Sequence, residues 1–183
     1  MSNIENYRYD WVWDKVKAGN MTIAKYQPLR IHENISVFSK DKINYYPIMR
    51  KCGFEKRVSK VYSESDILGC KKTDKIYVYD EGKFPVSIIK ESNADNSNKY
   101  HPTQKPVALL QYLIKTYTKE NETVLDFTMG SGSTGVACKN LNRNFIGIEL
   151  DEKYFNIAKQ RIENGFVQEK ITDTDLDKFA LFQ

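Results

Sequence analysis

The sequence predicts an α/β fold with a parallel sheet, and two observations carry this prediction. After residue 100 the hydrophobic pattern alternates between helical periodicity and short apolar runs, in the order helix, strand, helix, strand, helix. A loop rich in Gly and Ser, residues 130–135, separates the first of these strands from the next helix. The chain has 183 residues, of which 40% are hydrophobic and 28% charged, so one domain with a buried core is expected.

The first hundred residues predict short strands separated by irregular segments. Trp11 and Trp13 alternate with polar neighbours, which is typical of a strand with one buried face. Ile35 and Val37 repeat this alternation further along the chain. In order, the pattern predicts a strand at 9–16, a strand at 31–39, a charged, Tyr-rich and weakly periodic stretch at 40–75, two extended pieces within 76–89 and a loop at 91–100.

The segment after residue 100 predicts the helices and the buried strands. A helix is expected to begin near Pro106, because proline suits a helix start and pushes Lys105 out of the α region. Its apolar face is formed by Leu109, Leu110, Leu113, Ile114 and Tyr117. There follow a strand at 124–127 that is expected to be buried on both faces, a helix at 133–141, a buried strand at 145–150 and a last helix with Tyr154, Phe155, Ala158 and Ile162 on one face.

Composition excludes several classes of protein. No apolar run approaches the roughly 20 residues that span a bilayer, and the N-terminus has no signal-peptide pattern, so a cytoplasmic protein is expected. Cys52, Cys70 and Cys138 are odd in number and form no C-x-x-C pair, which predicts neither a disulfide framework nor a metal site. The net charge of +4 permits nucleic-acid binding. Bases interleave with tyrosines between residues 15 and 60, which suits phosphate contacts and also a solvated surface.

The glycine-rich loop predicts a ligand site at the ends of the strands. Residues 130–135 match G-x-G-x-x-G, follow a strand and open a helix, and Glu149 lies about twenty residues further on. The glycines let the backbone approach a ligand closely, and the acid can accept hydrogen bonds from ribose hydroxyls. This pattern alone suits an NAD-dependent dehydrogenase equally well.

Two further features favour a different ligand. The Asp126 carboxylate, four residues before the first glycine, would repel a pyrophosphate but can pair with an ammonium group. The segment HPTQKP at 101–106 places Lys105 just before a helix N-terminus, where its charge and the helix dipole favour a carboxylate. An ammonium site, a carboxylate site and a ribose site together describe S-adenosylmethionine.

Three segments resemble successive motifs of the DNA amino-methyltransferases: HPTQKP, LDFTMGSGSTG and FIGIELDEKYFNIAKQRI. YRYDWVWDKV and PLRIHENISVFSK resemble the later strands of the catalytic block, which in one permuted class precede the cofactor motifs. The resemblance, closest to phage and prophage members, implies S-adenosylmethionine-dependent methylation of adenine N6 or cytosine N4 in double-stranded DNA, as in restriction-modification systems, with adenine favoured. It implies a Rossmann-like methyltransferase fold with an irregular insert, in which residues 1–40 are catalytic-block strands, 41–99 recognise the target and 100–183 bind the cofactor.

The resemblance also assigns roles to individual residues. It places Thr103 and Lys105 at the methionine end of the cofactor and Glu149 at the ribose. The rest of the predicted cofactor site comprises His101, Asp126, Phe127, Thr128, Gly130, Ser131, Gly132, Ser133 and Thr134. Structural alternatives exist for several of them: Thr103 as a cap of its turn, Phe127 as core, Ser133 and Thr134 as helix openers, and Glu149 as a surface acid. His32 is interpreted as structural.

The family's catalytic motif is an Asp, Asn or Ser followed by Pro-Pro and an aromatic residue, which holds the flipped target base. The five prolines of this sequence are never adjacent, so no catalytic residue is assigned within it, and in the permuted class the motif would lie upstream of Tyr7. Its strand would lie beside residues 124–127, so we expect an incomplete central sheet with an exposed apolar edge. The sequence therefore predicts part of a methyltransferase, completed by an N-terminal chain or by self-association; a non-catalytic subunit or an inactive prophage remnant is the alternative.

Overall fold

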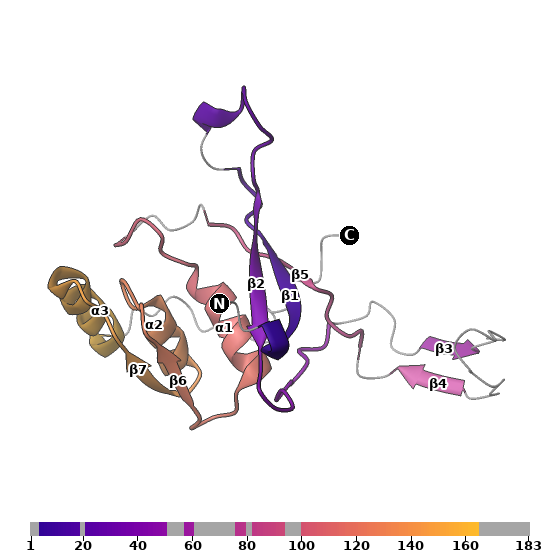
Figure 1. Cartoon of the computed structure of the whole chain (residues 1–183). Helices are drawn as coiled ribbons and strands as arrows, with labels where there is room; N and C mark the ends of the chain where they lie inside the picture. The colour runs from indigo at the N-terminus through magenta and orange to yellow at the C-terminus, as the bar shows by residue number, and fades with distance from the viewer. Residues whose placement is uncertain are drawn as a thin grey trace.

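The computed structural model of the chain describes residues 4–18, 21–50, 57–60, 76–79, 82–93 and 100–164, of which 57–60 and 76–79 are described as backbone. Figure 1 shows the arrangement of the elements. In chain order they are η1 (Ile4–Asn6), β1 (Tyr7–Asp14), η2 (Met21–Ile23), β2 (His32–Phe38), β3 (Arg57–Lys60), β4 (Ile76–Tyr79), β5 (Ile88–Lys90), α1 (Val107–Tyr117), β6 (Thr123–Asp126), α2 (Ser133–Asn140), β7 (Asn144–Gly147) and α3 (Glu152–Asn164).

The strands of the described residues form three separate sheets. β1 lies between β2, to which it is antiparallel, and β5, which runs parallel to it and pairs only with its last three residues. β6 and β7 form a parallel pair, with Leu125 opposite Ile146. β3 and β4 form an antiparallel pair within the predicted recognition region, about half of which lies outside the described residues, as do Cys52 and Cys70.

Helix α1 joins the β2–β1–β5 sheet to the β6–β7 sheet. On one side, Leu109 and Tyr112 are buried in a cluster with Trp11, Trp13 and Ile89. On another side, Ile114 packs with Ala137 and Cys138 of α2. Helix α1 therefore contributes buried side chains to both core clusters. Each fully buried leucine or isoleucine contributes about 1.5–3 kcal/mol of hydrophobic stabilisation.

The buried tryptophans of β1 keep their polar atoms satisfied. The Trp11 Nε1–H donates to the Tyr117 hydroxyl at 2.5 Å, and the Trp13 Nε1–H donates to the Glu91 carbonyl at 2.8 Å. An indole N–H left unpaired in the core would cost about 1–3 kcal/mol. These contacts fix β1 against α1 and against the segment that follows β5.

The predicted order of elements after residue 100 is confirmed, with boundaries displaced by one to three residues. α1 begins at Val107 with Pro106 as its N-cap, and its hydrophobic face is the predicted one. The prediction that strand 124–127 is buried on both faces is wrong. Leu125 is 57% exposed and Ile146 is 54% exposed, because α1 and α2 cover only the opposite face of the pair.

The β6–β7 sheet is therefore open in two ways within the described part of the chain. One of its faces carries exposed apolar side chains, and β6 has a strand neighbour on one edge only.

No helix of the described ranges has the length and apolar character needed to cross a membrane.

Candidate functional site

The site is built around the C-terminal end of β6. The Asp126 carboxylate accepts a hydrogen bond from the Thr134 hydroxyl at 2.6 Å and another from the Thr128 backbone N–H at 3.1 Å. Bonds to a charged acceptor contribute about 1.5–3 kcal/mol each. Asp126 thus fixes the loop between β6 and α2 from both of its ends.

The loop turns sharply at two glycines. Gly130 has a φ of 51° and Gly132 a φ of 77°, in the left-handed region that other residues adopt at a cost. Gly132 also contacts α3 closely: a Cβ at this position would lie 2.8 Å from the Ala158 Cβ. Helix α3 therefore packs directly on the loop, and a side chain at Gly132 would prevent this packing.

Glu149 stands at the end of the neighbouring strand and closes the loop. Its Oε2 accepts the Gly130 N–H at 2.8 Å and its Oε1 accepts the Asp151 N–H at 3.0 Å. The N–H groups of Asp151 and Gly130 hold the pKa of the Glu149 carboxyl below its usual value. The carboxylate is ionised at neutral pH, and each oxygen keeps a lone pair for a further donor.

A histidine forms one wall of this loop. The His101 ring meets Tyr154 edge to face, with ring centroids 4.4 Å apart, and lies 3.6 Å from the position that a Cβ on Gly130 would take. The Thr103 N–H donates to His101 Nδ1 at 3.2 Å, and the Thr103 hydroxyl lies 3.0 Å from the same nitrogen. Thr103 therefore orients the imidazole.

Two buried polar residues that the sequence reasoning left unassigned connect the elements of the site. The Ser131 hydroxyl donates to Gln104 Oε1 at 2.9 Å, and the Ser131 carbonyl accepts a bond from the buried Arg161 guanidinium of α3. Gln104 and Arg161 are only 8% and 7% exposed. The spacing of Arg161 within an otherwise amphipathic helix, on its buried face, is the signal that could have identified it.

Lys105 faces the β1–β2 hairpin. Its ammonium is 3.5 Å from Glu33 Oε2, while Lys15 binds the other oxygen of Glu33 at 3.3 Å. The Lys105 ammonium also lies 5.9 Å from the centre of the Trp13 ring. Two ammonium groups sharing one carboxylate leave a net positive charge at this point, which favours a second anion.

The remaining predicted residues differ in exposure. Phe127 is 71% exposed, so its alternative assignment to the core is wrong. Ser133 is buried, and its hydroxyl has no hydrogen-bond partner among the described residues. Leu150, beside Glu149, is fully exposed. Two carboxylates at adjacent strand ends, a close-approach loop between them and apolar side chains next to both can hold a ligand that combines a cation, vicinal hydroxyls and a flat ring.

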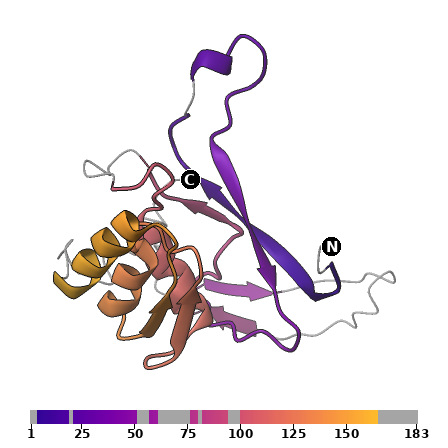
Figure 2. The ribbon, with the colours of Figure 1, turned by 60° about the vertical axis from the view of Figure 1, so that its left-hand side comes forward.

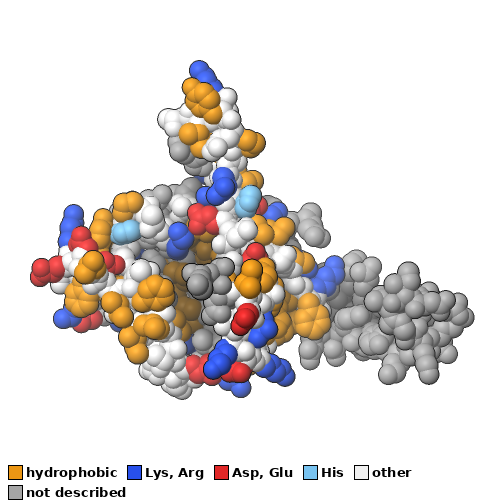
Figure 3. Space-filling view, viewed as in Figure 1, with side chains coloured by type: hydrophobic (Ala, Val, Ile, Leu, Met, Phe, Trp, Pro, Cys, Tyr) orange, Lys and Arg blue, Asp and Glu red, His pale blue; other side chains and the backbone are white. Residues whose placement is uncertain are grey.

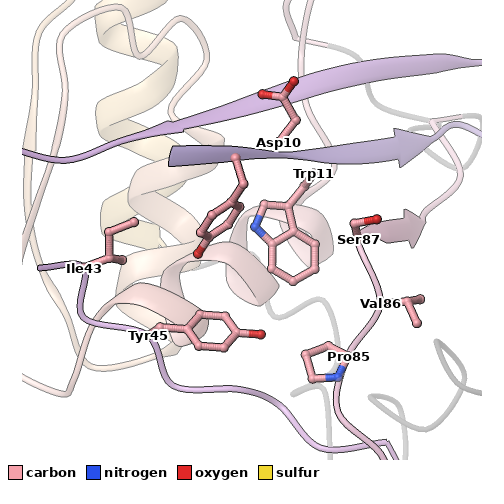
Figure 4. Close-up of a pocket in the computed structure, with 8 residues that line it drawn as sticks. Asp10, Trp11, Ile43, Tyr45, Pro85, Val86 and Ser87 are labelled. Carbon is pink, nitrogen blue, oxygen red and sulfur yellow. The ribbon is translucent and has the colours of Figure 1, made fainter. Parts of the chain in front are cut away.

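A separate pocket of about 380 Å³ lies along β1, next to residues 85–87, which precede the start of β5 (Figure 4). It is lined mainly by apolar and aromatic side chains, and in Figure 4 Tyr45 and Trp11 point toward it from opposite sides while Asp10 points away. The lining residues are Tyr9, Asp10, Trp11, Ile43, Tyr45, Pro85, Val86 and Ser87. Within the described residues, this part of β1 lacks the strand neighbour that β5 supplies to its last three residues.

The described residues include no group of three or more His, Cys, Asp or Glu side chains able to hold a metal ion.

Comparison with known proteins identifies the family of the chain. The profile of the N6/N4 DNA methylase family matches residues 2–160. The chain belongs to this family. The type II methyltransferase M2.LlaDCHI of Lactococcus lactis subsp. cremoris is 39% identical over 117 residues, which are 57% of this chain and 44% of the relative. M2.DpnII of Streptococcus pneumoniae is 39% identical over 115 residues, which are 56% of this chain and 43% of the relative. The chain thus spans less than half the length of these relatives.

Solved structures share the fold of this chain. The crystal structure of the M1.HpyAVI–SAM complex has a TM-score of 0.55 and 30% sequence identity, covering 85% of this chain and 62% of the other. The cytosine-N4-specific PvuII DNA methyltransferase has a TM-score of 0.56 at 17% identity, covering 93% of this chain and 54% of the other, which shows the fold alone. The predicted α/β methyltransferase fold is confirmed.

Proposed function

We propose that this chain is the methyl-donor part of a site-specific DNA amino-methyltransferase and binds S-adenosylmethionine. The observation that carries the proposal is the pair of carboxylates, Asp126 and Glu149, at the ends of adjacent parallel strands, bonded to the same loop: Glu149 accepts the Gly130 N–H and Asp126 accepts the Thr128 N–H. The chain's family and the S-adenosylmethionine complex of the 30%-identical M1.HpyAVI support the same ligand.

The residues of the site fit the three parts of this cofactor. Glu149 is ionised and has free lone pairs for the two ribose hydroxyls. Asp126 offers negative charge to an ammonium group, while the shared Lys105–Glu33–Lys15 cluster offers net positive charge to a carboxylate. The buried, unpaired Ser133 hydroxyl is one more donor at the loop. When bound, the cofactor supplies a methyl group on a positively charged sulfur.

The described residues of the site bind and orient, and none of them is assigned the removal of a proton. His101 is fixed with its Nδ1 as an acceptor from Thr103, and it packs on Tyr154 and Gly130, so it acts as a wall. Phe127 and Leu150 provide apolar surface for a flat ring beside the two carboxylates. We infer from the overall resemblance that the acceptor is adenine N6 in duplex DNA rather than cytosine N4.

The open side of β6 supports the proposal that a segment outside these 183 residues completes the enzyme. Leu125 and Ile146 expose apolar surface, and within the described residues β6 has no strand on its second edge. Figure 3 shows hydrophobic side chains in a hollow between the lobe formed by β6, β7 and α3 and the central β1–β2 hairpin. A parallel strand carrying the Pro-Pro-aromatic motif would satisfy the free backbone groups of β6, and further residues of the same segment would cover the exposed face.

Calorimetry with S-adenosylmethionine tests the cofactor part. The expected result is one binding site, with at least a tenfold loss of affinity in Glu149→Gln and in Asp126→Asn, because each variant removes a charged acceptor. Lys153→Gln, an exposed position on α3, is the matched single-charge control and should bind normally. No binding by a folded sample, or equal loss in the control, would refute the assignment.

A methylation assay tests the completion. The chain alone with duplex DNA and labelled cofactor should show no turnover, whereas addition of the N-terminal portion of M2.LlaDCHI should restore it, with N6-methyladenine as the product detected by mass spectrometry. Turnover by the chain alone would refute the need for another segment, and N4-methylcytosine would refute the acceptor. Cofactor binding with no turnover in any mixture would favour a non-catalytic binding subunit, which the absence of adjacent prolines also allows.

A further inference from the structure

Residues 15–31, which we call the hairpin arm, connect β1 to β2, and their described part, 15–18 and 21–31, forms a projection. Its base is closed by the Lys15 N–H, which donates to the Ile31 carbonyl at 2.7 Å. Toward the tip, η2 and the turn after it are held by bonds such as Tyr26 N–H to the Ile23 carbonyl at 2.9 Å. Figures 1 and 2 show the arm extending well beyond the rest of the described chain.

The arm carries the net charge of the whole protein. It contains four basic residues and no acidic one, whereas the other 166 residues contain 24 of each sign. Lys15 is neutralised by Glu33 at the base. Lys17, Lys25 and Arg30 are exposed, and within the described part of the chain none of them forms an ion pair. A positive potential therefore extends from the arm into solvent.

Two large apolar side chains stand among these cations without a packing partner in either core cluster. Tyr26 is 88% exposed and Met21 is 69% exposed. An exposed tyrosine ring that packs in no core cluster has apolar surface that a binding partner could bury. Exposed aromatic rings between bases suit stacking or groove contacts with nucleic acid better than they suit a merely solvated loop.

The arm also leaves the molecule beside the proposed methyl-donor site. It follows the C-terminal end of β1, and Glu33 at its base contacts both Lys15 and Lys105 of the HPTQKP segment. In Figure 1 the tip of the arm lies at the same end of the molecule as the loop that follows β6. A DNA duplex held there would lie across the end of the sheet where the methyl group is presented.

We propose that the hairpin arm is a DNA-contacting element, in which Lys17, Lys25 and Arg30 bind backbone phosphates of duplex DNA and Tyr26 packs into the groove. The inference rests on the proposed function, since that function supplies the reason for DNA to approach this end of the sheet. It is distinct from the predicted recognition region at 41–99, because phosphate contacts position a protein on DNA and do not read its sequence.

Fluorescence anisotropy with a labelled duplex of arbitrary sequence, titrated between 50 and 200 mM salt, tests the arm. Each phosphate contact contributes about 0.9 to the slope of log affinity against log salt, so Lys25→Gln/Arg30→Gln should lower the slope by about 1.8 and the affinity by about ten- to a hundredfold at 0.1 M salt. Tyr26→Ala should weaken binding with the slope unchanged. The control Lys153→Gln/Lys159→Gln removes the same charge from α3 and should change the affinity less than twofold.

Three results would each overturn the proposal that the arm contacts DNA. They are an unchanged salt slope in Lys25→Gln/Arg30→Gln, an equal loss of affinity in the control, and no DNA binding by the natural chain. Binding to vesicles containing phosphatidylserine in place of duplex DNA would assign the arm to a membrane surface. Calorimetry with S-adenosylmethionine on the same variants separates the two proposals, because a failure of the arm leaves cofactor affinity intact whereas a failure of the cofactor assignment abolishes it in every variant.

Discussion

Gly132→Ala tests whether α3 packs directly on the loop between β6 and α2. The substitution meets two costs. A φ of 77° costs an L-residue about 1–2 kcal/mol, of which about 0.4–1 kcal/mol is offset by the lower entropy of the unfolded chain. The new Cβ would also lie 2.8 Å from the Ala158 Cβ and 3.0 Å from its Cα, and a backbone atom cannot rotate away. Overpacking of this kind costs about 1–3 kcal/mol, so a total loss of about 2–4 kcal/mol is expected.

Gly130→Ala is the matched control, because its φ of 51° carries the same backbone cost while its nearest neighbour, the His101 ring, stays at an ordinary 3.6 Å. Its expected loss is about 1 kcal/mol. Urea unfolding followed by circular dichroism measures both values, and the m-value shows whether the unfolded state changed. Ala158→Gly should recover part of the loss in Gly132→Ala. Equal losses for the two glycines, or no recovery, would refute the packing of α3 on the loop.

Three further predictions concern the same region. Thr134→Val should lower the free energy of unfolding by about 1.5–3 kcal/mol in urea, because Asp126 loses a charged hydrogen bond, while Thr134→Ser, which keeps the hydroxyl, should lose less than half as much. Burial raises the pKa of the Cys138 thiol to about 11, so peptide mass mapping at pH 8 should find Cys138 unlabelled by a thiol reagent until urea is added; rapid native labelling would contradict its burial. Because the pKa of Glu149 is lowered in the folded state, its ionised form stabilises the fold above about pH 4.5, and this contribution is lost as the pH falls through the folded pKa. Glu149→Gln should therefore flatten the acid side of a plot of urea midpoint against pH. An unchanged plot would contradict the bonds from Asp151 and Gly130 to this carboxylate.

The second half of the fold was predictable because its signals are local. Pro106, the apolar face beginning at Leu109 and the glycines of the loop each specify a helix start, a helix face or a turn without reference to distant residues. The position of Glu149 relative to Gly130 followed for the same reason, since adjacent parallel strands bring their ends together.

The first half was less predictable because its contacts are distant in sequence. The pairing of β5 with the end of β1 joins residues about 76 positions apart, and nothing in the three-residue strand itself indicates that partner. The exposure of Leu125 also escaped prediction. An apolar strand pattern shows that a face needs cover, but it does not show that the covering element is among the same residues.

Lys105 shows why the two halves act as one unit. The sequence assigned it to the carboxylate of a ligand, and the structure places its ammonium on Glu33, opposite Trp13 in the β1–β2 pair. These positions are compatible, because Glu33 is shared with Lys15 and the cluster keeps one positive charge. A carboxylate arriving there would neutralise that charge without displacing either lysine. Glu33, which binds Lys105, also binds Lys15 at the base of the hairpin arm, so under the proposed function the same ion-pair cluster would orient both the methyl donor and the arm.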